Sequence, residues 1–198
     1  QAHPEKELVV RNLSWAADEI DLQPRPANFA DSEQHLTAMR ADVVLAAFGY
    51  NESFAGKEGL PAFRARLTKY LGDVKAKAYN GKVAARVVLI SPIANENVKG
   101  VAAADRNNVN IKAYMEAMKE VATEQKVGFV DAFTATKKAM ASPGNDLTMN
   151  GAHLNEKGYQ LFASTVFNQL FGKGAPRLDE KVREAVVEKN RQHFFRYR

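Results

Sequence analysis

The sequence predicts an α/β fold in which helices cover both sides of a parallel sheet. The first observation is that short apolar runs of strand length alternate with longer segments whose apolar residues recur at helical spacing. The second is that the strand-like runs are apolar throughout, a pattern typical of strands buried on both faces. Strands and helices that alternate in this way favour a three-layer α/β/α arrangement.

Three buried strands are predicted at residues 42–48, 86–90 and 127–130, and a shorter strand is predicted at residues 8–12. In parallel sheets of this type, the loops after the carboxyl ends of the strands form the site. We therefore expect the functional residues in the polar loops that follow these strands and in the late loop that contains His153.

Helices are predicted at residues 31–40, 60–77 and 107–124, and a short helix is expected after residue 131. Another helix begins after Asn155, whose side chain can accept a hydrogen bond from a free N–H of the first turn. The apolar residues of this last helix have the spacing of one buried face: Tyr159, Phe162, Ala163, Val166, Phe167 and Leu170.

The 198 residues suit one sizeable domain with a short appendage, and a hydrophobic fraction of 45% is ordinary for a globular protein. We assign residues 1–171 to the domain, residues 172–177 to a linker and residues 178–198 to a C-terminal helix. This helix is charged and less regular than the others. We interpret it as a solvated helix that leads to another module.

Composition excludes several kinds of site. The absence of cysteine rules out disulfides, thiolate metal ligands and a cysteine nucleophile. The four histidines show no metal-ligand spacing and no glycine-rich loop follows a strand, so we expect neither a metal nor a cofactor. A net charge of +5 without a nucleic-acid-binding motif does not indicate nucleic acid. No apolar run has the length of a transmembrane helix, and the first residues carry no signal-peptide pattern.

Two motifs carry the functional hypothesis. The sequence Gly-Tyr-Asn-Glu at residues 49–52 directly follows a predicted strand, where glycine allows a tight turn and the asparagine amide can point a donor into a cleft. The sequence Asn-Gly-Ala-His at residues 150–153 lies on a loop that the following helix holds in place, and such loops tend to carry catalytic residues. Taken alone, the turn is a common feature of strand ends and the histidine is as well explained by a loop hydrogen bond.

Together, these motifs resemble the SGNH (GDSL-type) hydrolase family. There, a Gly-x-Asn-Asp/Glu block supplies an oxyanion-hole side chain and a late Asp-x-x-His block supplies the base. The runs at residues 47–56, 89–93 and 151–159 are similar to that family as well, and the resemblance covers residues 8–171. It implies a flavodoxin-like sheet and ester hydrolysis through an acyl-enzyme.

The resemblance also implies roles for individual residues. Asn51 would donate to the oxyanion of a tetrahedral intermediate, and Gly49 would shape the turn that presents it. His153 would be the general base that takes the serine proton and later returns it to the leaving alcohol. In the neighbouring loop after residue 91, Asn95 or Asn97 could contact the substrate, against the alternative of ordinary loop polarity.

Three positions depart from the family pattern. The opening Gly-Asp-Ser block, which holds the nucleophile, is absent together with the first, interior strand of the sheet, so we interpret the sequence as N-terminally truncated. Ala17 stands where the family has a glycine whose backbone N–H joins the oxyanion hole. Asn150 stands where the family has the Asp that orients the histidine; Asn150, Asp146 or a backbone carbonyl are the alternatives for orienting His153.

The predicted function is that of a serine-type ester hydrolase acting on an O-acyl ester, small or carbohydrate-linked. The alternative is a non-catalytic module of the same fold that binds a glycan or a partner protein, which Asn150 and Ala17 favour. The resemblance favours export to the periplasm or the extracellular space. The sequence leaves the oligomeric state open.

Overall fold

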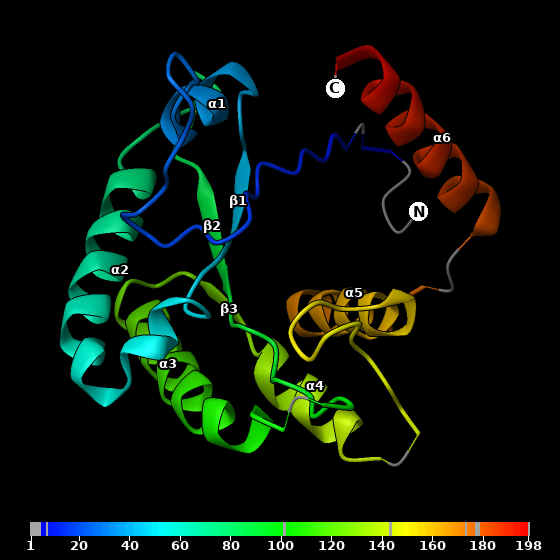
Figure 1. Ribbon diagram of the computed structural model, residues 1–198. Coiled ribbons are helices and arrows are strands. Elements are labelled where there is room, and N and C mark those ends of the chain that lie inside the picture. The colour runs from blue at the N-terminus through cyan, green and yellow to red at the C-terminus, as the bar shows by residue number, and fades with distance from the viewer. Residues whose placement is uncertain are drawn as a thin grey trace.

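The computed structural model describes residues 5–6, 8–100, 102–142, 144–172, 174–176 and 179–197, and it is built around a parallel sheet (Figure 1). The strands are β1 (Val43–Ala47), β2 (Arg86–Ile90) and β3 (Gly128–Val130), in the order β1-β2-β3. Val43 pairs with Arg86, and Val88 pairs with Gly128. All three strands lie inside their predicted ranges, which confirms the α/β fold with a parallel sheet.

Helices fill the segments between and after the strands. They are α1 (Ser32–Ala38), α2 (Leu60–Lys75), α3 (Ala104–Glu124), α4 (Ala132–Met140), α5 (Glu156–Phe171) and α6 (Glu180–Tyr197), with 3-10 turns η1 (Glu52–Ala55) and η2 (Lys57–Gly59) before α2. Helix α3 begins earlier than predicted, at Ala104. The predicted cap of α5 is confirmed, because the side chain of Asn155 accepts from the N–H of Gly158 at 3.0 Å.

Two layers of helices cover the sheet. On one face, α2 and α3 pack on alternate strand residues around a core that includes Val44, Val87 and Leu89. On the other face, α5 packs against β2 and β3 through Phe162, Val166 and Leu170. These three α5 residues are half-buried, whereas Tyr159 of the predicted apolar face is 61% exposed. The alternating contacts follow from the two-residue period of a strand.

The prediction that every strand is covered on both faces is wrong for β1. Its residues alternate between exposed and buried, and Val43 and Leu45 are 42% and 54% exposed. The reason is positional: β1 is an edge strand, and α5 covers only β2 and β3. Within the part of the chain that the structure describes, β1 therefore has one bare face and one free edge.

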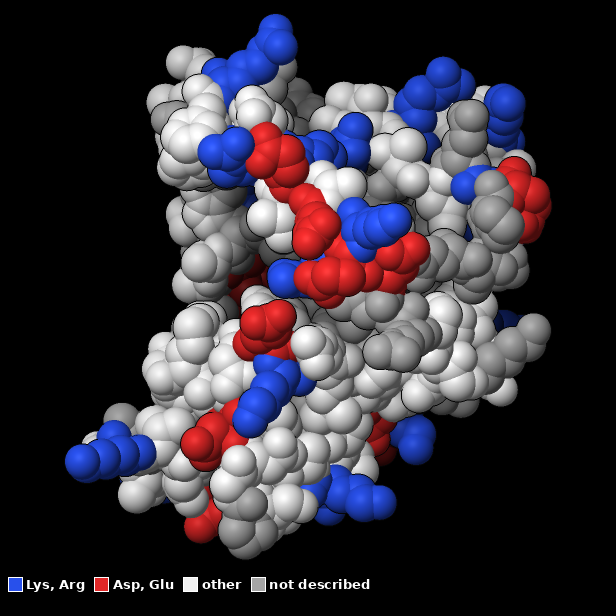
Figure 2. Space-filling model, turned by 90° about the vertical axis from the view of Figure 1, so that its right-hand side faces the viewer, with Lys and Arg blue, Asp and Glu red and all other residues white. Residues whose placement is uncertain are grey.

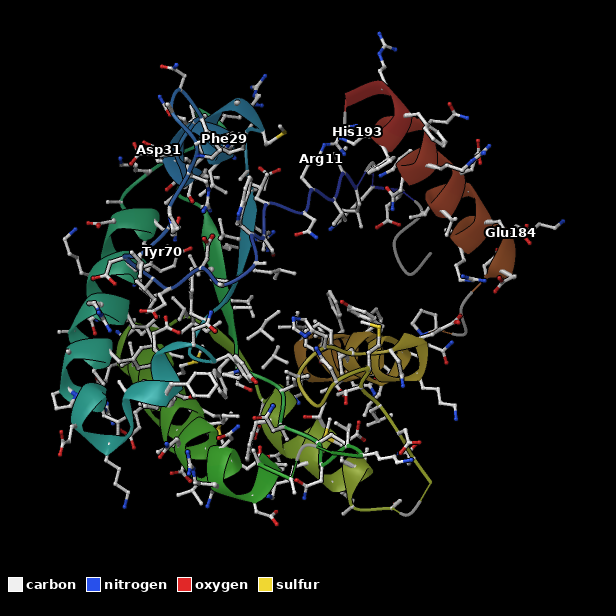
Figure 3. All side chains as sticks on the ribbon, in the orientation of Figure 1. Arg11, Phe29, Asp31, Tyr70, Glu184 and His193 are labelled. Carbon is white, nitrogen blue, oxygen red and sulfur yellow. The ribbon has the colours of Figure 1, made fainter. Side chains whose placement is uncertain are left out.

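The predicted strand at residues 8–12 is also not formed. The segment is extended but has no ladder partner, because β1 pairs only with β2 among the described strands (Figure 1). A groove of about 800 Å³ separates it from β1. The walls of the groove include Val10, Trp15, Val43, Leu45 and Tyr70. Figure 3 shows Arg11 on this segment and Tyr70 on α2.

Helix α6 lies apart from the sheet (Figure 1), and an ion pair of 3.9 Å joins its Arg183 to Glu156 of α5. Residues 173, 177 and 178 of the predicted linker and helix lie outside the described residues. On the face that carries α5 and α6, acidic and basic side chains are interleaved (Figure 2). Within the described part of the chain, no helix combines the length and apolarity needed to cross a membrane.

Candidate active site

The turn after β1 is held by a buried carboxylate. Gly49 has φ +97°, a conformation that L side chains rarely adopt, and a Cβ there would lie 3.0 Å from the Met118 sulfur. Glu52 is 4% exposed and accepts from the N–H of Gly49 at 2.8 Å and from the N–H of Ile20 at 3.1 Å. Burial raises the pKa of Glu52, and the backbone donors partly oppose that shift. Glu52 thus ties this turn to the loop that contains Ala17.

Asn51 and Ala17 both line the groove, as does Gly49. The amide of Asn51 donates to the carbonyl of Asp18 at a long distance of 3.4 Å, which leaves its second hydrogen for another acceptor. Ala17 has φ +66°, a left-handed conformation that glycine adopts more readily than alanine. Among the described residues, the Ala17 N–H has no hydrogen-bond acceptor.

His153 lies on the loop before α5 and is exposed. Its Nδ1 lies 3.0 Å from Oδ1 of Asn150, which also accepts from the N–H of His153 at 3.0 Å. An amide oxygen can only accept, so Nδ1 carries a proton in this contact and Nε2 is left as the basic nitrogen. The backbone carbonyl of Asp146 accepts from the side chain of Asn155 at 2.8 Å, and within the described residues no hydrogen bond joins the Asp146 carboxylate to the ring. Of the alternatives for orienting the ring, the structure places Asn150 in contact with it.

The His153 loop closes on itself before α5 begins. The N–H of Met149 donates to the carbonyl of His153 at 2.8 Å, and the N–H of Asn155 donates to the carbonyl of Leu147 at 2.9 Å. These bonds make a short hairpin of residues 147–155. The histidine is therefore held at the closed end of a loop rather than on a free segment.

Asn95 connects the two motifs. Its side-chain nitrogen donates to the hydroxyl of Tyr50 at 2.9 Å and to the carbonyl of Gly151 at 2.9 Å. Tyr50 precedes Asn51, and Gly151 lies two residues before His153. One side chain thus brings the turn after β1 and the histidine loop side by side, although about a hundred residues separate them in the sequence.

Asn95, a predicted candidate for substrate contact, is buried in the structure and bonded to other residues of the protein. Asn95 is 7% exposed, and its two amide hydrogens are used by Tyr50 and Gly151. The side-chain oxygen of Asn97 accepts from the N–H of Ala104 at the start of α3. The structural roles of Glu52 and Asn95 were not predicted from the sequence. A signal for them was available, since polar residues directly after apolar strands in an α/β chain are candidates for burial at the strand ends.

None of the six serines is seen against the His153 ring in the described structure. Ser53 and Ser91 are buried. The Ser53 hydroxyl donates to the carbonyl of Tyr50, and the Ser91 hydroxyl accepts from the N–H groups at the start of α4. The hydroxyls of Ser32 and Ser164 bond Gln23 and the carbonyl of Leu161. Asn51 and Ala17 thus line the groove, whereas His153 is not among its described lining residues and is linked to the turn after β1 through Asn95. Within the described residues, no serine hydroxyl bonds the His153 ring.

The comparisons with known proteins show the family and the fold of the chain. A model of the GDSL-like lipase/acylhydrolase family matches residues 3–161. Axe2, an acetylxylan esterase from Geobacillus stearothermophilus, has a similar structure, with a TM-score of 0.55 at 17% identity over 74% of this chain and 67% of Axe2. A variant described as an acetyl-xylooligosaccharide esterase gives 0.56 at 18% identity, over 73% and 67% of the two chains.

The lipase/acylhydrolase from Enterococcus faecalis gives a TM-score of 0.49 at 20% identity, over 72% of this chain and 67% of its own. No curated protein sequence matches this chain. At these identities, the likeness to Axe2 establishes the fold alone.

Proposed function

The chain belongs to the GDSL-like lipase/acylhydrolase family, a family of ester hydrolases, and we propose that it forms the oxyanion and general-base part of a serine-type esterase site. The observation that carries this proposal is the bridge by Asn95, which sets the Asn51 turn beside the His153 loop. An amide donor and an oriented imidazole at the carboxyl end of a parallel sheet are two of the three parts that acyl transfer requires, the third being the nucleophile.

The proposed chemistry uses each of these groups once. A serine oxygen attacks the acyl carbon while Nε2 of His153 takes the serine proton. The amide of Asn51 and the N–H of Ala17 donate to the oxyanion. The bond to the alcohol then breaks, and the imidazolium returns its proton to the leaving oxygen. Water repeats the sequence on the acyl-enzyme and releases the acid, with Asn150 holding the ring throughout.

We place the nucleophile on a strand that pairs with the free edge of β1. Three observations support this placement. No described strand pairs with the outer edge of β1, the exposed residues Val43 and Leu45 of this strand are apolar, and a groove separates it from the extended segment at residues 10–15. A strand in that groove would end beside the Gly49–Glu52 turn, because parallel strands present their carboxyl ends at one edge of the sheet.

The proposed substrate class is an acetyl or other short O-acyl ester of a carbohydrate. His153, Asn150 and Ala17 are exposed, so the site is open on the side of the leaving group. An open, polar site suits a bulky sugar alcohol, whereas a long acyl chain requires a buried apolar pocket to gain binding free energy.

The test uses the protein at the full length that its gene encodes. Purified protein is assayed with 4-nitrophenyl acetate and acetylated xylo-oligosaccharides, and with a fluorophosphonate probe that labels activated serines. We expect turnover and labelling, both lost in His153→Ala. The matched control His193→Ala changes a histidine on α6, away from the loop (Figure 3), and should keep full activity. A folded protein that neither labels nor hydrolyses any of these esters would refute the proposal.

The second candidate is a non-catalytic module that binds a glycan or a partner protein. The specific observation in its favour is that His153 is oriented by an amide, which cannot stabilise the imidazolium as a carboxylate does. Binding of xylo-oligosaccharides by calorimetry, without turnover and unaffected by His153→Ala, would favour this candidate over the esterase.

A further inference from the structure

We infer that Glu96 and Asn95 are positioning residues of the site, which hold the His153 loop against the turn after β1. Neither touches the reacting groups; both act through the backbone of the loop. The inference rests on the proposed function and extends it to the loop between β2 and α3. This loop carries no residue of the proposed chemistry, and it packs directly against the segment that does.

Glu96 holds the start of the histidine loop, and we call its bonds to Leu147 and Thr148 the clamp. Its carboxylate, 9% exposed, accepts from the N–H of Leu147 at 3.0 Å, from the N–H of Thr148 at 2.8 Å and from the hydroxyl of Thr148 at 2.5 Å. A carboxylate is costly to bury unless several donors satisfy it, and here three donors come from two consecutive residues. The carboxylate thus fixes the chain where the hairpin begins.

The clamp continues to the residues next to the histidine. The hydroxyl of Thr148, while donating to Glu96, accepts from the N–H of Gly151 at 3.0 Å. The carbonyl of Gly151 accepts from the N–H of Glu96 at 2.9 Å and from the side chain of Asn95 at 2.9 Å. The Gly151 residue is therefore held through both its N–H and its carbonyl, two positions before His153.

Asn95 links the histidine loop to the turn after β1. Besides bonding Gly151 and Tyr50, its side-chain oxygen accepts from the amide of Asn107 at 3.0 Å. Its backbone is fixed by Asn108, which accepts from the N–H of Asn95 at 2.8 Å and donates to its carbonyl at 2.9 Å. Helix α3 thus holds Asn95 rigidly, and Asn95 transmits that rigidity to both halves of the site.

The expected consequence of breaking the clamp is a misplaced base rather than weaker substrate binding. The hairpin would still close through its own bonds, but it would no longer be anchored to the sheet. A displacement of about 1 Å at a catalytic group costs on the order of 10²-fold in rate. We therefore expect kcat to fall about 100-fold at nearly constant KM, the pattern of an interaction that acts on the chemical step.

The test compares Glu96→Gln and Thr148→Val with Thr148→Ser, which keeps the hydroxyl. An amide at position 96 replaces one acceptor oxygen by an NH₂ group that faces backbone donors. The matched control is Glu124→Gln, the same change at the exposed end of α3. Amide hydrogen exchange of residues 147–151 is measured in the chain of 198 residues. The values of kcat and KM are measured in the full-length protein that is used to test the proposed function.

The inference is supported if Glu96→Gln and Thr148→Val both speed amide exchange at residues 147–151 by tenfold or more and both lower kcat. Thr148→Ser and Glu124→Gln should keep the exchange rates and the kcat of the parent protein. Unchanged exchange would overturn the clamp whatever the activity. Faster exchange with unchanged kcat would overturn the positioning role. A parent protein that does not hydrolyse esters would overturn the positioning role of both residues together with the proposed function. The exchange measurement would then show separately whether the clamp exists.

Discussion

The substitution Gly151→Ala measures how tightly the histidine loop is held. Gly151 has φ +89°, and a Cβ there would lie 2.8 Å from the carbonyl oxygen of Glu96. The left-handed conformation costs an alanine about 1–2 kcal/mol. Forcing a methyl group against a backbone atom in a packed site costs about 1–3 kcal/mol more. The reduced freedom of the unfolded chain offsets about 0.4–1 kcal/mol of the total.

A second glycine supplies the control for this experiment. Gly81 also has a positive φ, +74°, but nothing lies within 4 Å of a Cβ built there. Gly81→Ala therefore carries the backbone cost without the steric cost, and we expect it to lower the free energy of unfolding by about 1 kcal/mol. Gly151→Ala should lower it by about 2 kcal/mol more, because the loop must move away from Glu96.

The assay is urea unfolding followed by circular dichroism, with both variants and the parent chain measured at the same pH. Hydrogen exchange of the loop amides detects local opening if the loop separates before the sheet unfolds. The reasoning is refuted if the two variants differ by less than about 0.5 kcal/mol while exchange in the loop stays as slow as in the parent chain.

Three further predictions concern the site itself. Burial raises the pKa of Glu52 above its ordinary 4.5, so the folded protein keeps that proton where the unfolded chain has released it; stability then falls as pH rises through this interval. Glu52→Gln should flatten the fall, and unfolding midpoints that show the parent's pH dependence would contradict this. Asn51→Ala should lower kcat for 4-nitrophenyl acetate about 10²–10³-fold, and a loss below fivefold would remove Asn51 from the oxyanion site. Asn150→Asp should raise kcat about tenfold, because a carboxylate beside His153 favours the imidazolium while keeping the same ring orientation; an equal or lower kcat would show that the amide is already sufficient.

Local patterns in the sequence were enough to predict the elements of the fold. The apolar runs at residues 86–90 and 127–130 became β2 and β3, and Asn155 caps α5 as its position before an amphipathic segment indicated. These features depend on residues close together in the chain, where periodicity and capping chemistry act directly. The carboxyl ends of parallel strands lie at the same end of a sheet, so the order of elements also predicted that both motifs lie at that end.

Long-range features could not be predicted from the same patterns. The apolar run of β1 did not reveal that Val43 and Leu45 lie on a bare face, since a pattern of residues does not show which neighbours are present. The segment at residues 8–12 failed as a strand for the same reason, because a ladder needs a partner. The clamp by Glu96 joins residues about fifty positions apart, and no spacing rule in the sequence connects them.

Asn155 has a consequence for how the loop can vary. Its side-chain oxygen caps α5, its side-chain nitrogen bonds the carbonyl of Asp146, and its N–H closes the hairpin on Leu147. A single residue thus fixes both the first turn of a helix and the number of residues between that helix and the start of the loop. An insertion or deletion between His153 and Asn155 would leave the cap on α5 intact but would move Asn155 away from the carbonyls of Asp146 and Leu147, so a change in the length of this segment opens the hairpin.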